Sequence, residues 1–347
     1  MAMMKTGHEV DRERRRFLGT AALAATQVAL VGSAAAQVPP ATAPDDPRTT
    51  TSFRLVRQVD AGVLSVGFAE AGAADGPPVV LLHGWPYDIH SFVDVAPLLA
   101  AQGYRVIVPY LRGFGTTTFR SGRTFRNGQQ SAVALDVIAL MDALAIRKAI
   151  LGGFDWGSRT AAIVAALWPE RCRGLVAVSG YLVTNLAANR QPLPPQAELG
   201  WWYQYYFATE RGMLGYTANR RDFNRLIWRI ASPTWAFDDA TYDRTAKAFD
   251  NPDHVPIVIH NYRWRLSLAK GEPQYDALER RLARAPDITV PTITIGSDFD
   301  GAAADGRSYA KRFSGRYSHR VLDGIGHNVP QEAPEEFARA IADVDRL

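Results

Sequence analysis

The alternation of short β-branched segments with helical segments is the feature that most restricts the fold of this 347-residue chain. Strand patterns occur at residues 53–59, 63–69, 79–82, 106–109, 149–152, 175–179, 292–295 and 319–322. Helical patterns lie between them at residues 91–102, 129–144, 158–168 and 308–313, with a closing helix from Pro334. Such alternation predicts an α/β fold with a mostly parallel, doubly wound sheet.

The alternation stops near Gly180 and returns at residue 292, so one long segment is inserted between two strands of the sheet. Residues 201–264 of this insertion hold 15 aromatic side chains in 64 positions, whereas aromatic residues make up 10% of the chain. A small helical subdomain with an aromatic core explains part of this enrichment. We further expect an aromatic cap that encloses a substrate pocket over the carboxyl ends of the strands. The predicted domains are a core of residues 52–180 and 286–347 and a cap of residues 181–285.

Composition and charge exclude several classes of protein. With 47% hydrophobic and 21% charged residues, the chain can bury a large core, which excludes a wholly disordered or collagen-like protein. The formal net charge is +4, of which residues 1–36 contribute +2, so we expect no nucleic-acid partner. Cys172 is the only cysteine, and no His/Cys spacing suggests zinc. We expect neither a metal nor a cofactor.

The first 36 residues have the pattern of a targeting peptide. A basic stretch leads into an uncharged, Ala-rich run over residues 17–36 that is too polar for a confident membrane span. Arg14 and Arg15 resemble the pair of a twin-arginine signal, and Ala34 and Ala36 suit cleavage by signal peptidase. We expect an exported, periplasmic protein with no stable membrane association after cleavage; the alternatives are an uncleaved anchor or a chance arginine run. The predicted segments are a signal peptide at residues 1–36 and a linker at residues 37–51.

A G-x-D-x-G motif at residues 153–157 joins the strand at residues 149–152 to the helix that follows. In a nucleophile elbow the chain turns so sharply that small residues must flank the reactive side chain, as Gly153 and Gly157 do here. The central residue is Asp155, whose attack on carbon would give an ester, so the leaving group should sit on an sp³ carbon. The alternative is that Asp155 only caps the helix.

Other strand ends carry residues that complete a catalytic set. The turn at residues 83–86 follows a buried strand, and we expect the N–H groups of Trp85 and Trp156 to form an oxyanion hole. Asp298 and Asp300 follow the strand at residues 292–295, and a carboxylate at this strand end would orient a histidine. His327 lies in a Gly-flanked loop after the last strand and would be the base. The order of nucleophile, acid and base matches that of α/β-hydrolases.

Together these motifs resemble the α/β-hydrolase-fold proteins of the epoxide hydrolase and haloalkane dehalogenase group, over about residues 50–345. The marks are the HGWP turn at residues 83–86, the elbow at Asp155, and the loop at His327. Segments 202–207 and 261–263 resemble the cap segments in which epoxide hydrolases carry two ring-opening tyrosines.

The resemblance implies that Tyr203 and Tyr262 are the acids. Because Tyr205 and Tyr206 are close in sequence to Tyr203, either of them could take its place. The alternative for Tyr203 and Tyr262 is that they only pack in the aromatic interior of the cap. The resemblance also implies an epoxide hydrolase that makes a vicinal diol through an Asp155 ester and acts on a small apolar epoxide or halide. A homodimer is a candidate oligomeric state. The residues expected to bind substrate are His83, Pro86, Trp202 and Phe207.

Departures from the family pattern leave alternatives open. Ser297 stands where the family often has glycine, so Asp298 competes with Asp300 as the acid. Arg159 resembles an arginine that fluoroacetate-type dehalogenases use for a substrate carboxylate, but an ion-paired helix residue is the simpler expectation. The runner-up function is dehalogenation through the same ester, with Trp156 lining a halide site and Trp85 or a cap tryptophan as the second donor. A non-catalytic binding protein is a third hypothesis.

Overall fold

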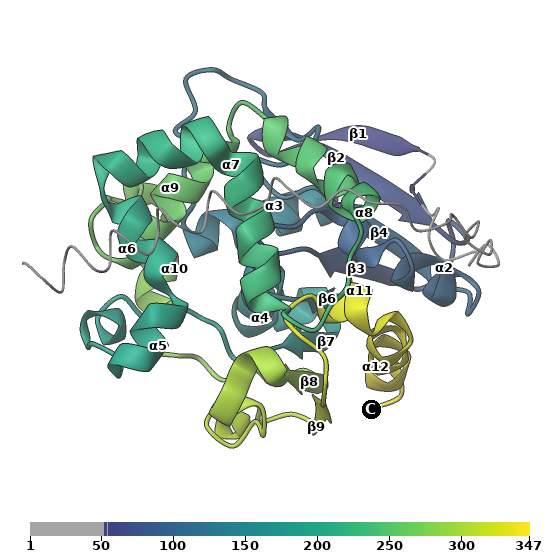
Figure 1. Ribbon diagram of the computed structural model, residues 1–347. Helices are drawn as coiled ribbons and strands as arrows, with labels where there is room; N and C mark the ends of the chain where they lie inside the picture. The colour runs from purple at the N-terminus through teal and green to yellow at the C-terminus, as the bar shows by residue number, and fades with distance from the viewer. Residues whose placement is uncertain (1–51, 54) are drawn as a thin grey trace, which may run out of the picture. The chain divides into compact units, whose positions relative to one another are not determined.

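A mostly parallel sheet forms the centre of the molecule (Figure 1). The structure is a computed structural model that describes residues 52, 53 and 55–347, so the predicted signal peptide and linker lie outside the described residues. The described strands pair in the order β1-β2-β4-β3-β6-β7-β8-β9, and β5 pairs with β2. They are β1 (Val56–Ala61), β2 (Leu64–Ala71), β3 (Pro78–Leu82), β4 (Arg105–Pro109), β5 (Thr118–Phe119), β6 (Ala149–Gly153), β7 (Cys172–Val178), β8 (Thr292–Ser297) and β9 (Tyr317–Leu322).

Strand order places the predicted motifs at one edge of this sheet. β2 is antiparallel to β1, β4 and β5, whereas every pairing from β4 through β3, β6, β7 and β8 to β9 is parallel. The chain leaves β3 towards β4 and then returns past β3 to β6. In open α/β sheets, ligands bind beyond the carboxyl ends of the strands at such a reversal. The residues that follow β3 and β6 therefore occupy the expected position of a ligand site.

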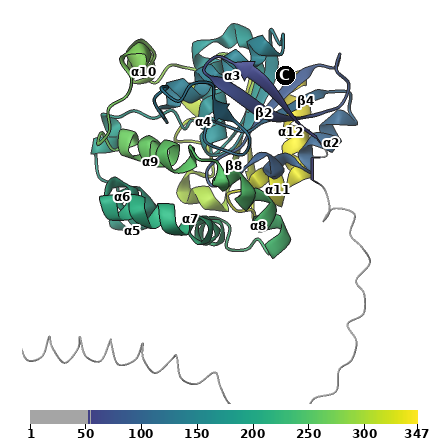
Figure 2. The same ribbon diagram turned by 90° about the horizontal axis from the view of Figure 1, so that it is seen from above.

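Helices cover both faces of the sheet (Figure 2). A methyl group at Gly152 of β6 would meet Ile341 of α12, whereas one at the next residue, Gly153, would meet the backbone of Gly157 in α4. Because successive strand residues face opposite sides, α12 and α4 lie on opposite faces. α2 packs with α12, and α3 packs with α4. These helices are α2 (Val95–Ala100), α3 (Gln130–Ala143), α4 (Trp156–Leu167) and α12 (Pro334–Arg346), with the short α11 (Val329–Glu332) before α12.

The insertion between β7 and β8 contains helices and, within the described residues, no strand. Its α-helices are α5 (Pro195–Gly200), α6 (Trp202–Ala208), α7 (Glu210–Ala231), α8 (Asp239–Ala246), α9 (His254–Arg265) and α10 (Asp276–Leu282). Aromatic side chains from α6, α7 and α9 bury one another: Phe207 contacts Tyr216 and Tyr262 at ring-centroid distances of 4.9 and 5.4 Å. The aromatic enrichment of the sequence therefore builds the interior of this helical layer, which we call the cap.

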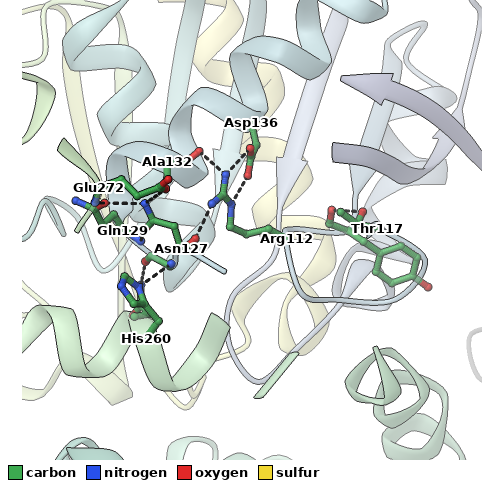
Figure 3. Close-up of polar contacts among 11 residues, drawn as sticks. Arg112, Thr117, Asn127, Gln129, Ala132, Asp136, His260 and Glu272 are labelled. Carbon is green, nitrogen blue, oxygen red and sulfur yellow. Dashed lines mark hydrogen bonds and ion pairs between the residues drawn. The ribbon is translucent and has the colours of Figure 1, made fainter. Parts of the chain in front are cut away.

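A buried polar network joins the cap to the sheet (Figure 3). The Arg112 side chain, only 2% exposed, donates to both carboxylate oxygens of Asp136 on α3 at 2.6 Å and to the Asn127 carbonyl oxygen at 2.5 Å. In the same loop, the Gly128 N–H donates to Nδ1 of His260 on α9 at 2.9 Å. Removing one partner of a buried ion pair typically costs about 3–5 kcal/mol, because the remaining charge stays buried without compensation. This network therefore fixes the loop on which α9 rests.

Some predicted elements differ from those observed. The helix predicted at residues 308–313 is only a 3₁₀ turn, η7 (Ala310–Arg312), because the backbone at Gly306 has φ of +73° and too few residues follow before β9. The helix predicted at residues 91–102 is split into η1 (Ile89–Phe92) and α2. The first two strands begin later than expected, and the two-residue β5 was not predicted. The remaining 3₁₀ helices are η2 (Pro169–Arg171), η3 (Ala188–Arg190), η4 (Lys247–Asp250), η5 (Pro273–Tyr275) and η6 (Asp298–Ala303).

The contact between α4 and β3 gives a stability test. A methyl group at Gly157 would overlap the carbonyl oxygen of Leu82, so we expect Gly157→Ala to lower the free energy of unfolding by at least ~1–3 kcal/mol. Gly122→Ala is the matched control, because nothing lies within 4 Å of a methyl group there. Urea unfolding should separate the two variants; equal stabilities would contradict this view of the turn.

Candidate active site

The turn between β6 and α4 presents the carboxylate of Asp155 to the carboxyl edge of the sheet. Asp155 has φ of 51° and ψ of −122°, and although it stands at the N-cap position of α4, its side chain makes no capping hydrogen bond. Instead, Oδ1 accepts a hydrogen bond from the Trp85 N–H at 2.7 Å, and Oδ2 lies 3.7 Å from Nε2 of His327. The geometry therefore favours the nucleophile interpretation over simple capping.

The surroundings of Asp155 keep it ionised. Burial by itself would raise the pKa of Asp155, but the adjacent imidazole of His327, the positive charge of Arg159 and the Trp85 N–H outweigh burial. The pKa of the carboxyl group is consequently lower than its ordinary value. A carboxylate that is charged at neutral pH and held by one oxygen leaves the other oxygen available for attack.

His327 follows β9 and faces Asp155 from the neighbouring loop. Its ring packs on Phe299 at a centroid distance of 4.0 Å and lies 5.9 Å from the rings of Phe154 and Tyr87. Nδ1 of His327 is buried and has no hydrogen-bond partner within the described part of the chain. The imidazole is thus held by ring packing, and the contact with Phe299 was not anticipated from the sequence.

Neither candidate acid contacts His327 in this structure. Oδ2 of Asp300 accepts a hydrogen bond from the Ser297 N–H at 3.0 Å, and Oδ2 of Asp298 accepts one from the Gly324 N–H at 3.1 Å. Both aspartates belong to η6: Asp300 caps this 3₁₀ helix by binding the N–H of its N-cap residue, whereas Asp298 binds the loop that follows β9. The expected contact from Asp300 to the imidazole is therefore absent among these residues, and the role of Asp300 stays a prediction.

Tyr203 and Tyr262 meet close to the Asp155 carboxylate. Their rings lie 5.4 Å apart at an interplanar angle of 87°, and each ring centroid lies 5.2 Å from that of Trp85. Burial raises the pKa of both hydroxyl groups, and the charge of Asp155 raises both further. Both tyrosines are therefore protonated at neutral pH and able to donate a hydrogen bond or a proton.

The two competing tyrosines of α6 point elsewhere. Tyr205 is 48% exposed, and its hydroxyl group donates to the carboxylate of Glu198. The ring of Tyr206 stacks on Phe223 at a centroid distance of 5.9 Å. A methyl group at Gly215 would meet the Tyr206 hydroxyl, which therefore lies against α7. Of these three tyrosines, geometry brings Tyr203 to the nucleophile.

The two tryptophans expected at the oxyanion hole differ. The Trp85 N–H already holds Asp155, and its indole Nε1 donates to the hydroxyl of Tyr216 on α7 at 3.0 Å. The Trp156 N–H makes no hydrogen bond to the Asp155 carboxylate among the described residues. Its indole Nε1 is buried and faces the Tyr262 hydroxyl group, without a hydrogen bond of standard geometry to any described residue. One of the two predicted backbone donors is thus in place beside the carboxylate.

The residues expected to bind substrate fall into two groups. Trp202 lines the cavity above Asp155, whereas Phe207 is fully buried and packs behind Tyr203.

His83 donates through Nδ1 to the Gly84 carbonyl at 2.9 Å and accepts through Nε2 from the Leu111 N–H at 3.1 Å. Burial lowers the pKa of His83 to about 4, so it is neutral and holds the turn after β3. The Pro86 carbonyl oxygen accepts from the Trp228 indole at 2.8 Å, and neither His83 nor Pro86 lines the cavity.

A small cavity of about 20 Å³ separates the cap from the catalytic residues. Such a volume suffices for about one water molecule, so an organic substrate requires side chains of the cap to move. A larger open groove of about 600 Å³ between α7 and α9 shares no lining residue with it. The cavity is lined by Trp85, Asp155, Gly200, Trp201, Trp202, Tyr203, Ile227, Ile230, Ala231, Phe299 and His327.

Arg159 differs from the simpler expectation of an ion-paired helix residue. It is 6% exposed, its Nε donates to the Leu182 carbonyl at 3.0 Å, and it makes no salt bridge with any described residue. Burial and the nearby charge of Arg265 lower the pKa of Arg159 to about 10, while Asp155 opposes this shift. Arg159 therefore remains charged at neutral pH and contributes positive potential at the nucleophile.

Two further findings concern the described residues. They contain no group of three or more His, Cys, Asp or Glu side chains arranged to hold a metal ion. Among them we also find no helix with the length and apolar character needed to span a membrane.

Comparisons with known proteins identify the family. Residues 77–329 match the family model described as alpha/beta hydrolase fold. A solved structure of an epoxide hydrolase candidate from Klebsiella pneumoniae superposes with a TM-score of 0.83 at 58% sequence identity, covering 85% of this chain and 98% of that one. An epoxide hydrolase from Caballeronia sordidicola is 32% identical over 313 residues, covering 80% of this chain and 89% of the relative.

Haloalkane dehalogenases also occur among the relatives. The one from Psychrobacter cryohalolentis is 25% identical over 301 residues, covering 83% of this chain and 90% of the relative. The described fold and this set of relatives together establish the class of protein. The chain is a hydrolase that belongs to the alpha/beta hydrolase fold family, in the group that contains the epoxide hydrolases.

Proposed function

We propose that this protein hydrolyses a small apolar epoxide to a vicinal diol through a covalent ester on Asp155. The observation that carries the proposal is the position of an ionised carboxylate below two buried, protonated tyrosines, Tyr203 and Tyr262. The ring oxygen of an epoxide is a poor leaving group, because it departs as a basic alkoxide. A nucleophile paired with proton donors meets that requirement.

In the first step, Oδ2 of Asp155 attacks a ring carbon, since Oδ1 is held by the Trp85 N–H. A new carbon–oxygen ester bond forms while the ring carbon–oxygen bond breaks, and its electron pair goes to the ring oxygen. One tyrosine gives its proton to that oxygen and the other donates a hydrogen bond. The high pKa of both tyrosines keeps their protons in place until negative charge develops on the substrate.

In the second step, His327 takes a proton from water, and the resulting hydroxide adds to the carbonyl carbon of the ester. The Trp85 N–H, already directed at Oδ1, stabilises the oxyanion that forms there. Collapse of this intermediate breaks the bond between the carbonyl carbon and the ester oxygen, which takes the proton of the imidazolium and leaves as part of the diol. The Asp155 carboxyl group formed in this way then loses its proton to the tyrosinate, which restores both groups. Asp300 stays our candidate for stabilising the imidazolium, which would require its carboxylate to release the Ser297 N–H.

Dehalogenation through the same ester is the second candidate. The buried indole Nε1 of Trp156 is a donor that a leaving halide could take from the Tyr262 hydroxyl group. Arg159 makes no salt bridge with another described residue, which suits it to a haloacid carboxylate. The indole of Trp85 is less suited to be the second halide donor, because it is bound to Tyr216. A role as a non-catalytic binding protein is disfavoured by the placement of Asp155, Trp85 and His327 around one point.

Trapping the ester tests the proposed chemistry. His327→Gln removes the base for hydrolysis but leaves Asp155 and both tyrosines, so the ester should form and persist. With an epoxide identified by screening for diol release, intact mass should rise by one substrate, and peptide mapping should locate it on Asp155. Asp155→Asn is the matched control and should stay unmodified. Turnover by His327→Gln at the parent rate would contradict this mechanism.

Removing the two hydroxyl groups separates epoxide opening from dehalogenation. General acid assistance is typically worth ~10²–10⁴ in rate, so the Tyr203→Phe/Tyr262→Phe variant should form ester from an epoxide slower by at least that range. Each single variant should be intermediate, and Tyr205→Phe, whose hydroxyl contacts Glu198, should match the parent. The measurement is pre-steady-state ester formation. An undiminished rate in the double variant would exclude these acids, and undiminished haloalkane cleavage as well would favour the dehalogenase.

We also propose export through the twin-arginine route, on the basis of Arg14, Arg15, Ala34 and Ala36. Mass spectrometry of protein from the periplasm of its bacterial host should detect a mature chain that begins at or near Gln37. Replacing Arg14 and Arg15 by lysine should leave the precursor inside the cell. Intact Met1 on periplasmic protein would contradict cleavage.

A further inference from the structure

The loop that carries His327 is bound through its backbone to a single carboxylate, that of Glu332 at the end of α11. Oε2 accepts a hydrogen bond from the Gly326 N–H at 2.8 Å, and Oε1 accepts one from the Asn328 N–H at 3.0 Å. The residues immediately before and after the histidine are therefore fixed by the two oxygens of one side chain. Oε1 also accepts from the hydroxyl of Ser232 at 2.6 Å.

Ser232 extends this network from the core to the cap. It is the residue that follows α7, is 1% exposed, and its Oγ accepts the N–H of His327 itself at 2.9 Å. The same N–H also lies 3.2 Å from the carbonyl oxygen of Ala231. Three successive N–H groups, from residues 326 to 328, are thus satisfied by Glu332 and the end of α7.

This backbone network matters because, among the described residues, no carboxylate binds Nδ1 of the His327 imidazole. Nδ1 of His327 has no partner among the described residues, and the candidate acids Asp298 and Asp300 bind backbone groups instead. Ring packing against Phe299 limits the tilt of the imidazole but does not set its distance from Asp155. That distance depends on where the backbone of residue 327 is held.

We propose that Glu332, acting with Ser232, is a positioning residue that sets the place of His327 for ester hydrolysis. The inference rests on the proposed function, because it assigns Glu332 to the second chemical step alone. Ester formation uses Asp155 and the two tyrosines and needs no base, so displacement of His327 should leave it intact. A misplacement of about 1 Å in a catalytic group can cost ~10²-fold in rate.

Glu332→Gln tests the charge and the two acceptors with little change of shape. The Gly326 N–H binds one oxygen and the Asn328 N–H binds the other, so either orientation of the amide turns an NH₂ group towards a backbone donor. Glu336→Gln makes the same chemical change four residues later, at a side chain paired with Arg339 near the surface, and is the matched control.

Single-turnover reactions with a screened epoxide should measure ester formation and ester hydrolysis separately by quenched-flow mass spectrometry. We expect Glu332→Gln to slow hydrolysis ~10²-fold while ester formation stays within ~3-fold of the parent, and Glu336→Gln to change neither. Unchanged hydrolysis would overturn the inference. An equal loss in both steps, accompanied by a lower melting temperature, would also overturn it, because it would mark a general structural role.

Ser232→Ala provides a second variant that leaves Glu332 and its two backbone contacts in place. It should slow hydrolysis less than Glu332→Gln, and the double variant should be no slower than Glu332→Gln alone, because both residues act through one network. Full additivity of the two effects would contradict a shared network. If even His327→Gln gives no adduct with any epoxide tested, the proposed function itself fails, which is a different outcome from failure of this inference.

Discussion

The close contact between the β6–α4 turn and the end of β3 is the constraint on which the site depends. Asp155 is held at a positive φ that L-residues rarely adopt, a conformation that typically costs of order 1–3 kcal/mol. Glycine on the facing turn makes this approach possible, because a methyl group at Gly84 would collide with the Asp155 side chain. As a result, the carboxylate accepts a hydrogen bond from the Trp85 N–H and does not cap the helix α4 that begins beside it.

Electrostatics then divide the site into two layers. One layer holds an ionised carboxylate and a buried arginine that has no salt bridge to any described residue. The other holds two tyrosines whose protons are retained by burial and by the charge of Asp155. Under the proposed mechanism, the negative charge that would make Asp155 a nucleophile also keeps the two tyrosines protonated. Formation of the ester would remove that charge, and proton transfer from the tyrosines would become easier as the ring oxygen needs it.

Sequence reasoning predicted the parts of the fold and site that depend on local signals. The G-x-D-x-G spacing predicted a sharp turn between a strand and a helix at Asp155. Strand–helix alternation predicted the α/β architecture that the structure and the family comparison confirm. Contacts decided by competing local hydrogen bonds could not be predicted as securely. Asp300 was expected on His327, yet its position three residues after Ser297 is also the spacing of a capping residue, and in the structure the backbone contact prevails. Arg159 was expected in an ion pair, but the partner of a charged side chain depends on residues distant in sequence.

Trp85 connects the core of the molecule to the cap. Its backbone N–H binds the nucleophile in the core, while its indole binds Tyr216 in the cap and its ring packs against Tyr203 and Tyr262. A cap that swings away either breaks the indole hydrogen bond or pulls on the residue that polarises the carboxylate. Under the proposed mechanism, the hydrogen bond that supports the nucleophile would therefore depend on the position of the cap.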